Sequence, residues 1–245
     1  MKWTASIAQI DPPPWMPGAL AFIAGFVDAC TFVGLFGLFV AQLTGSYVVA
    51  GASMFAPGWP EATVLLAVPM FFAGGVVATL VATTAGANGL PALACALGLE
   101  TALLAGFAAI MMSIGPLPAR PPEAFGAALL GLAAMGAQSA LVRLKLRGVA
   151  STNVMTTNTT QIAIEATQAF LTFAQRHRDP EVARQHAAAR HGLARMLPLP
   201  LGFSFGVVSG ALAFATVGRW VVVLPALATA ALTLWALRAE RGAPR

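Results

Sequence analysis

Long apolar blocks, separated by short polar or proline-rich connections, dominate the pattern of this chain. A helix needs about 20 apolar residues to cross the hydrocarbon core of a bilayer, and six blocks reach or approach that length. They lie at residues 18–42, 61–85, 90–114, 125–142, 197–217 and 220–237. The pattern therefore predicts an all-α fold, a polytopic transmembrane helix bundle with about six spans.

Composition agrees with this prediction and changes what the net charge means. Hydrophobic residues make up 58% of the chain and charged residues only 9%, with a mean hydropathy of +0.78, whereas soluble domains carry about 25% charged residues. The formal charge of +5 therefore indicates orientation in a membrane, because basic residues concentrate in cytoplasmic loops. It does not indicate nucleic-acid binding, which needs clustered basic residues and exposed aromatics.

The densest basic stretch is the connection 175–196, and the C-terminal tail is also rich in arginine. Two predicted spans separate them, so we expect both on the cytoplasmic side, together with both termini. Asp179-Pro180-Glu181 predicts the start of a short surface helix. The connection also holds three histidines, for which a solvated loop is favoured over a metal or proton-sensing site: His177, His186 and His191. Residues 1–245 are expected to form a single integral membrane domain.

Two stretches interrupt the apolar pattern in a similar way. GFVDA (25–29) aligns with GAQSA (136–140), and one inserted residue then brings LTGSYVV (43–49) over MTTNTTQ (155–161). Few positions are identical, so chance similarity is the alternative. The alignment predicts that a helix, a threonine-containing break and a short second helix occur twice in the chain.

Each half, 18–115 and 123–238, would then add two further spans after its interrupted segment. Three spans per half force the halves into opposite orientations, which predicts an inverted 3+3 repeat with two interrupted or half-helix segments. Such paired interruptions are the best sequence indication of a transporter binding site. The polar residues 150–174 are left open between a re-entrant, an interfacial and a spanning segment.

Two carboxylates lie inside the apolar blocks, Asp28 in the first and Glu100 in the third. A charged group at this depth costs about 2.5–3.5 kcal/mol on insertion scales, so it suggests a function. Two acids without a basic residue in the same spans favour proton or cation chemistry. For Asp28 the alternative is a structural carboxylate that caps a neighbouring helix.

The two breaks supply further candidate ligands, because a broken helix exposes backbone groups at membrane depth. A central site for a solute or ion would be lined by nearby polar and small residues: Thr44, Gly45, Ser46, Gln138, Ser139, Thr156, Thr157, Asn158 and Glu165. Hydrogen bonds between helices are the alternative for Gln138 and Ser139. Glu165 is assigned equally to a cavity and to the cytoplasm.

Enzyme chemistry is not indicated by any motif in this chain. The sequence has no HExxH, GxSxG or phosphate-loop pattern and no paired intramembrane aspartates. We therefore expect no enzymatic activity, no catalytic residue, no cofactor and no bound metal. Cys30 and Cys95 are expected to be reduced and buried, acting as small apolar side chains.

The phrases GFVDACTFVGLFGLFVAQLTGSYVVAG and GLAAMGAQSALVRLKLRGVASTNVMTTNTTQIA resemble the YoaK-type bacterial membrane proteins, a domain-of-unknown-function family. The resemblance covers nearly the whole chain and implies a multi-pass protein of the bacterial inner membrane, without an established activity. In that family the first break usually reads Thr-Gly-Asn, where this chain has Thr44-Gly45-Ser46. The second usually contains Thr-Gly, where this chain has Thr156-Thr157.

The favoured function is a small secondary transporter or permease for a small solute or ion, coupled to protons or cations through Asp28 and Glu100. A non-transporting scaffold or accessory subunit, which uses the same polar residues to pack its helices, is one alternative. An ion channel is another. The expected partners are the lipid bilayer and an unidentified small solute or ion, with no nucleic acid, and a homo-oligomer is left open.

Overall fold

The computed structural model describes residues 9–35, 37–53, 55, 65–114, 122–177 and 179–242. All the named elements in this part of the chain are helices. In chain order they are α1 (Met16–Gly34), α2 (Leu43–Ser53), α4 (Ala67–Ala87), α5 (Ala92–Ser113), α6 (Pro122–Lys145), α7 (Met155–Phe173), α8 (Pro180–Met196), α9 (Pro198–Val217), the 3-10 helix η1 (Gly218–Val222) and α10 (Val223–Gly242).

Five helical stretches of the described chain are long and apolar enough to cross a membrane, which identifies a multi-pass membrane protein. Four of them are α1, α4, α5 and the Ala124–Lys145 part of α6. The fifth, Pro180–Gly242, runs through α8, α9, η1 and α10. The last two predicted spans correspond to α9 and α10 within it. The prediction of an all-helical membrane bundle is therefore confirmed.

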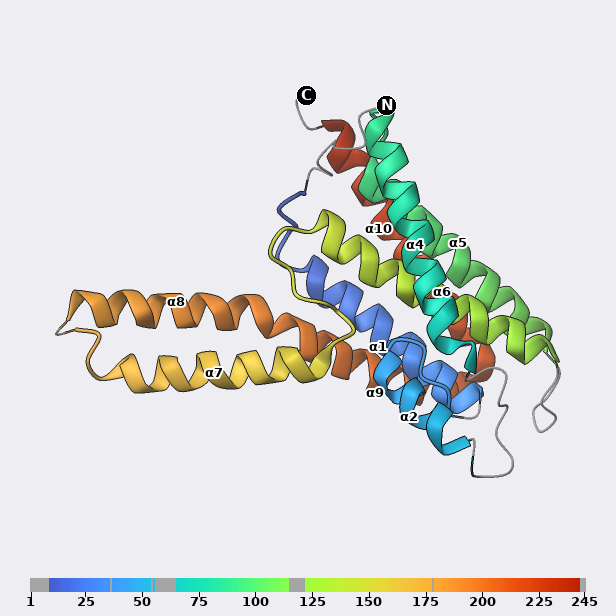
Figure 1. Cartoon of the computed structure of the whole chain (residues 1–245), viewed down its shortest axis with the longest axis horizontal. Helices are drawn as coiled ribbons and strands as arrows, with labels where there is room; N and C mark the ends of the chain where they lie inside the picture. The colour runs from blue at the N-terminus through green and yellow to red at the C-terminus, as the bar shows by residue number, and fades with distance from the viewer. Residues whose placement is uncertain are drawn as a thin grey trace.

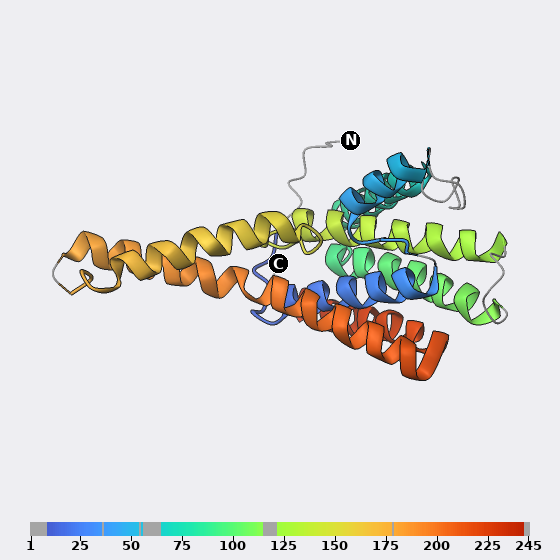
Figure 2. The ribbon, with the colours of Figure 1, turned by 90° about the horizontal axis from the view of Figure 1, so that it is seen from below.

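Two closely packed helix pairs organise the bundle (Figure 1). Helix α1 packs along α9, and α4 packs along α6, while α5 packs against both α6 and α10. In Figure 2 these helices run in roughly one direction across the bundle. Leucines from four of them are fully buried in the shared core, namely Leu20, Leu97, Leu132 and Leu199.

Glycines bring α1 and α9 into backbone contact. A Cβ atom at Gly25 of α1 would lie 2.2 Å from the carbonyl oxygen of Phe203 in α9. A Cβ atom at Gly206 of α9 would lie 2.2 Å from the carbonyl oxygen of Phe22 in α1. No side chain fits at such distances, so these glycines set how closely the two helices approach.

The crossing of α4 and α6 is built in the same way. A Cβ atom at Gly136 of α6 would lie 1.9 Å from the carbonyl oxygen of Phe71 in α4. A Cβ atom at Gly74 of α4 would lie 2.0 Å from the carbonyl oxygen of Ala133 in α6. Each crossing thus has glycines on both helices that face the partner's backbone.

Helices α7 and α8 form a hairpin that extends away from the bundle (Figures 1 and 2). Among the described helices, α7 is not one of those apolar enough to count as a span. Residues 155–173 therefore form the first arm of this hairpin. The second half has a longer helix after its break than predicted, with 19 residues in α7 against 11 in α2.

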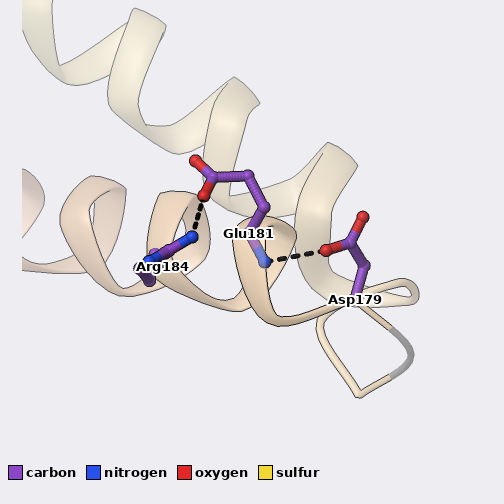
Figure 3. A network of polar contacts seen from close by, with 3 residues as sticks. All are labelled: Asp179, Glu181 and Arg184. Carbon is purple, nitrogen blue, oxygen red and sulfur yellow. Dashed lines mark hydrogen bonds and ion pairs between the residues drawn. The ribbon is translucent and has the colours of Figure 1, made fainter.

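The predicted start of α8 is confirmed (Figure 3). The side chain of Asp179 accepts a hydrogen bond of 2.7 Å from the backbone amide of Glu181, and Pro180 opens the helix. Glu181 pairs with Arg184 on the same helix face. The basic connection is thus mainly helical, and α9 follows α8 after Leu197.

The end of the bundle at which α1 begins and α6 and α10 end is called the basic end below. There the amide of Ile10 donates to the carbonyl of Lys145 (2.8 Å), and the Ile10 carbonyl accepts from the amide of Arg147 (2.9 Å). Glu240, near the end of α10, accepts hydrogen bonds of 3.1 and 3.0 Å from two amides in the first turn of α5. Glu240 also interacts electrostatically with Lys145. These contacts join both ends of the described chain to the bundle.

The irregular segment in each half lies before the polar tripeptide from which the helix break was predicted. The described residues between α1 and α2 and between α6 and α7 are irregular, whereas Thr44-Gly45-Ser46 and Thr156-Thr157-Asn158 lie in the first turns of α2 and α7. The predicted position of the interruption was therefore wrong by a few residues. Small polar residues are unfavourable inside helices but common near helix starts, so they marked the beginning of a helix.

A crossing glycine replaced by alanine is expected to destabilise the bundle. Gly74→Ala places a methyl group against the Ala133 carbonyl, so α4 and α6 must separate, at a cost of about 1–3 kcal/mol. Thermal unfolding of the purified protein, followed by size-exclusion chromatography of heated samples, measures this loss. Gly51→Ala on α2 is the control, because a Cβ atom there would meet nothing within 4 Å. Equal melting temperatures for the two variants would contradict this packing.

Candidate functional site

Asp28 ties the first break to α1. Its side chain is 3% exposed, and Oδ1 accepts hydrogen bonds from the backbone amides of Val40 (2.7 Å) and Ala41 (2.8 Å). In hydrocarbon each unsatisfied backbone group costs several kcal/mol, and an ionised acceptor forms a stronger hydrogen bond than a neutral one. Asp28 therefore caps the chain segment that leads into α2, which is the structural alternative considered for this residue.

Neutral side chains hold the second break to α6. Gln138 Nε2 donates hydrogen bonds to Thr152 Oγ1 (2.9 Å) and to a backbone carbonyl of α1 (3.0 Å). Asn153 Nδ2 donates to Ser139 Oγ (2.9 Å). Because Ser139 aligns with Asp28, the same helix position contacts the following break in each half.

A further hydrogen bond closes each break, and its donor and acceptor are equally far apart along the chain in both halves. Ser46 Oγ donates to the carbonyl of Phe39 (2.7 Å), and Asn158 Nδ2 donates to the carbonyl of Ser151 (2.8 Å). In each case the acceptor lies seven residues earlier in the chain, and the donor residue is 2% exposed. Ser46 and Asn158 align with each other. The remaining residues of the two tripeptides are exposed or half-buried: Thr44, Gly45, Thr156 and Thr157.

Glu100 is fully buried, and neither of its carboxylate oxygens has a hydrogen-bond partner in the described part of the chain. It lies on the buried face of α5, between Leu97 and Leu104. Beside it on the helix, Thr101 Oγ1 lies 3.2 Å from Thr233 Oγ1 of α10. An ionised carboxylate cannot remain in such surroundings without a partner, so this group requires a proton, a cation or a change of structure.

Glu165 belongs to the hairpin. Gln161 Nε2 donates a hydrogen bond of 2.9 Å to its Oε1, and a Cβ atom at Gly192 of α8 would lie 2.6 Å from its carboxyl carbon. The side chain therefore lies between α7 and α8, away from Asp28 and Glu100.

A groove of about 570 Å³ lies between α2, α4 and α6. Tyr47 of α2 and Phe72 of α4 give it a largely apolar wall, and Ser139 and Arg143 of α6 add polar groups. The groove therefore joins the helix after the first break to the helix before the second. Asp28 and Glu100 do not line it.

The predicted site residues thus occupy separate places. Asp28 and Ser46 hold the first break, while Gln138, Ser139 and Asn158 hold the second. Among the residues described, no hydrogen bond joins the two breaks to each other or either of them to Glu100. The hydrogen bonds therefore form two break sites, with one isolated carboxylate in the core.

Thr152 and Asn153 are polar residues of the second break that sequence reasoning did not single out. Ser, Thr and Asn directly before an apolar or helical stretch commonly cap helices, and Ser151-Thr152-Asn153 stands just before α7. That capping signal could have identified them. The capping of α5 by Glu240 had no such local signal, because the two are far apart in sequence.

No group of three or more His, Cys, Asp or Glu side chains within the described ranges is placed to hold a metal ion. His186 is buried in the hairpin, where its Nδ1 lies 3.0 Å from Thr172 Oγ1. Both cysteines are free, Cys30 buried and Cys95 only partly buried. The expectation that both would be buried therefore holds fully for Cys30 alone.

Removing the carboxylate of Asp28 is expected to destabilise the first break. Asp28→Leu leaves two buried amides without an acceptor, at about 1–3 kcal/mol for each donor, whereas Asp28→Asn retains an oxygen acceptor. Melting temperature and folded yield should therefore fall in the order wild type, Asp28→Asn, Asp28→Leu. Ser139→Ala is the matched variant of the other half and removes one neutral hydrogen bond, worth about 0.5–1.5 kcal/mol. An Asp28→Leu protein as stable as Asp28→Asn would contradict the capping role.

Comparison with known proteins gives a family and no characterised relative. Residues 17–235 match the model of a family described as "Protein of unknown function (DUF1275)". No curated protein and no solved structure matches the chain.

Proposed function

We propose that this chain, which belongs to the DUF1275 family of proteins of unknown function, is a small secondary transporter of the bacterial inner membrane. Its substrate is a small solute or ion, and a proton or another cation drives it. The observation that carries this proposal is the fully buried Glu100, which has no partner in the described part of the chain.

The two helix crossings support an inverted repeat. The sequence alignment pairs Gly25 of α1 with Gly136 of α6. It thereby relates the α1–α9 crossing to the α4–α6 crossing, because Gly25 lies against Phe203 and Gly136 lies against Phe71. The contact of Gly206 with Phe22 corresponds in the same way to the contact of Gly74 with Ala133. Repeats of three spans have opposite orientations, and inverted repeats of this kind are the framework of many secondary transporters.

The two breaks support the same relation between the halves. Ser46 and Asn158 make hydrogen bonds of identical separation along the chain, and Asp28 and Ser139 both contact the break that follows their helix. These two matched pairs of contacts favour a repeat over chance similarity. Interrupted helices in corresponding positions are where such transporters bind their substrates and ions.

The repeat also explains the position of Glu100. Phe71 of α4 and Phe203 of α9 make corresponding contacts in the two crossings. The shift along the chain from Phe71 to Phe203 also pairs Thr101 with Thr233, and these two threonines are in contact. A residue that touches its own counterpart lies on the two-fold axis between the halves. Glu100 is the neighbour of Thr101, so it lies close to this axis at the middle of the bundle. Its counterpart is Leu232, which leaves one carboxylate for each molecule.

This placement assigns a role to Glu100 in coupling. The carboxylate is stable in the core when it carries a proton or a cation, and it can release that ion when a conformational change exposes it to water. Exposure to the two membrane faces in turn would carry one ion per cycle. The irregular segments at the two breaks are the places where the backbone can bend during such a change.

We assign the protein six crossings, with both termini in the cytoplasm. Counting α9 and α10 as separate spans gives three spans in each half. The arginines of the hairpin and of the α10 end then lie on one face, as the distribution of basic residues in membrane proteins requires.

A non-transporting scaffold is the second candidate, and the hydrogen bonds of Asp28, Gln138 and Ser139 favour it. All of these bonds are made within the chain itself. A scaffold needs such contacts to hold its helices, but it has no use for an unpartnered Glu100.

Flux measurements in proteoliposomes test the proposal. Purified protein is reconstituted into vesicles that contain a pH-sensitive dye, and a panel of small solutes is added under a proton or sodium gradient. We expect solute-dependent ion movement in the wild type and background movement in Glu100→Gln, because glutamine cannot bind and release a proton. Glu165→Gln is the matched control and should retain wild-type flux.

Two results would contradict the proposal. One is wild-type flux in a correctly folded Glu100→Gln protein. The other is absence of flux for every solute in the panel, combined with a melting temperature of Glu100→Gln well above that of the wild type, because a scaffold would gain stability from removal of the buried acid.

A further inference from the structure

A second cavity lies at the basic end of the bundle, beside the start of the second break. It encloses about 670 Å³. Its walls are the proline-rich segment before α1, the loop 147–149 after α6 and the junction between α8 and α9. The cavity is therefore bounded by both halves of the chain.

Positive charge exceeds negative charge in this cavity. Arg147, Arg195 and His191 line it, together with the single carboxylate Asp11. Arg147 Nη1 lies 3.7 Å from Asp11 Oδ2, and both side chains are mostly exposed. An exposed pair at that distance contributes little, so the N–H groups of Arg147 are available to a ligand.

Gly148 places the second guanidinium over the cavity. Arg195 donates a hydrogen bond to the Gly148 carbonyl, and a Cβ atom at position 148 would lie 2.1 Å from Arg195 Nη2. Gly148 also has a φ of 65°, a conformation that favours glycine. A side chain at position 148 would therefore displace the Arg195 guanidinium from this place. A guanidinium has five N–H donors, so Arg195 retains several for a bound group.

The cavity lies at the depth of the lipid headgroups. Pro198, one of its lining residues, begins the apolar helix α9. On the opposite side, Pro14 lines the cavity and is followed by Trp15. The ring of Trp15 packs edge-on against the ring of Trp235, with 5.4 Å between the ring centroids. Tryptophan is enriched at the boundary between hydrocarbon and water, so this pair marks that boundary.

We propose that this cavity binds a phosphate group, supplied by the headgroup of an anionic phospholipid. Guanidinium groups bind phosphate through paired N–H donors, and basic pockets beside spans on the cytoplasmic side hold anionic headgroups. Depth decides between a lipid and free phosphate, because the acyl chains of a headgroup bound here can lie along the exposed apolar residues of α9, which include Leu201 and Phe205. The bound lipid would join the first half to the hairpin side of the second. This inference is independent of transport.

Lipid-dependent thermal stability tests the proposal. The purified protein in a neutral detergent is titrated with phosphatidylglycerol, with phosphatidylcholine or with inorganic phosphate, and its melting temperature is measured. We expect phosphatidylglycerol at saturation to raise the melting temperature of the wild type by roughly 5 °C, and phosphatidylcholine and inorganic phosphate to have little effect. Arg147→Gln/Arg195→Gln should lose this increase.

Arg176→Gln/Arg184→Gln removes the same charge from the hairpin away from the cavity and should respond like the wild type. Gly148→Ala displaces Arg195 without changing the net charge and should weaken the response, so the test does not depend on the double variant alone. An equal response of Arg147→Gln/Arg195→Gln and the wild type would overturn the site. An equal effect of inorganic phosphate and phosphatidylglycerol would overturn its assignment to a lipid.

Discussion

Polar groups at a helix break inside an apolar bundle need hydrogen-bond partners, whether they belong to the backbone or to side chains, and this requirement organises both halves of the protein. In the first half the carboxylate of Asp28 receives the amides of Val40 and Ala41. In the second half, Gln138 and Ser139 hold the break through Thr152 and Asn153. Because these acceptors and donors project from the preceding helix, each break stays attached to its own half. The close glycine crossings between α1 and α9 and between α4 and α6 then join the halves.

The halves share this framework but differ in charge and in length. The first break is held by a carboxylate and the second by neutral side chains, and only the second half carries the hairpin of α7 and α8. In the proposed repeat Glu100 is paired with Leu232, so only the first half supplies a carboxylate at this position of the core. Two halves that differ in this way need not open with equal ease.

Much of the fold follows from the sequence, because apolar length alone identifies spans. The six predicted blocks overlap α1, α4, α5, α6, α9 and α10, although α9 and α10 lie within one of the five apolar stretches and α1 ends at Gly34, before the end of its predicted block. The cap at Asp179 was also predicted correctly. The candidate site was harder to predict, because hydrophobicity does not say which way a polar side chain points. Asp28 and Glu100 both lie in apolar sequence, yet Asp28 accepts two backbone hydrogen bonds and Glu100 has no partner in the described part of the chain. The break after α1 brings the amides of Val40 and Ala41 to Asp28, whereas the described helices packed around α5 bring no partner to Glu100.

The opposite orientation of the two halves is the central claim, and cysteine labelling in cells tests it most directly. Phe55 lies just after α2 and Gln175 lies just after α7, and both are exposed. Phe55→Cys and Gln175→Cys are made separately in a background in which Cys30 and Cys95 are replaced by alanine. A membrane-impermeant maleimide should label Phe55→Cys from the outer face of intact spheroplasts, and Gln175→Cys only after the membrane is permeabilised. Labelling of both variants from the same face would contradict the inverted repeat.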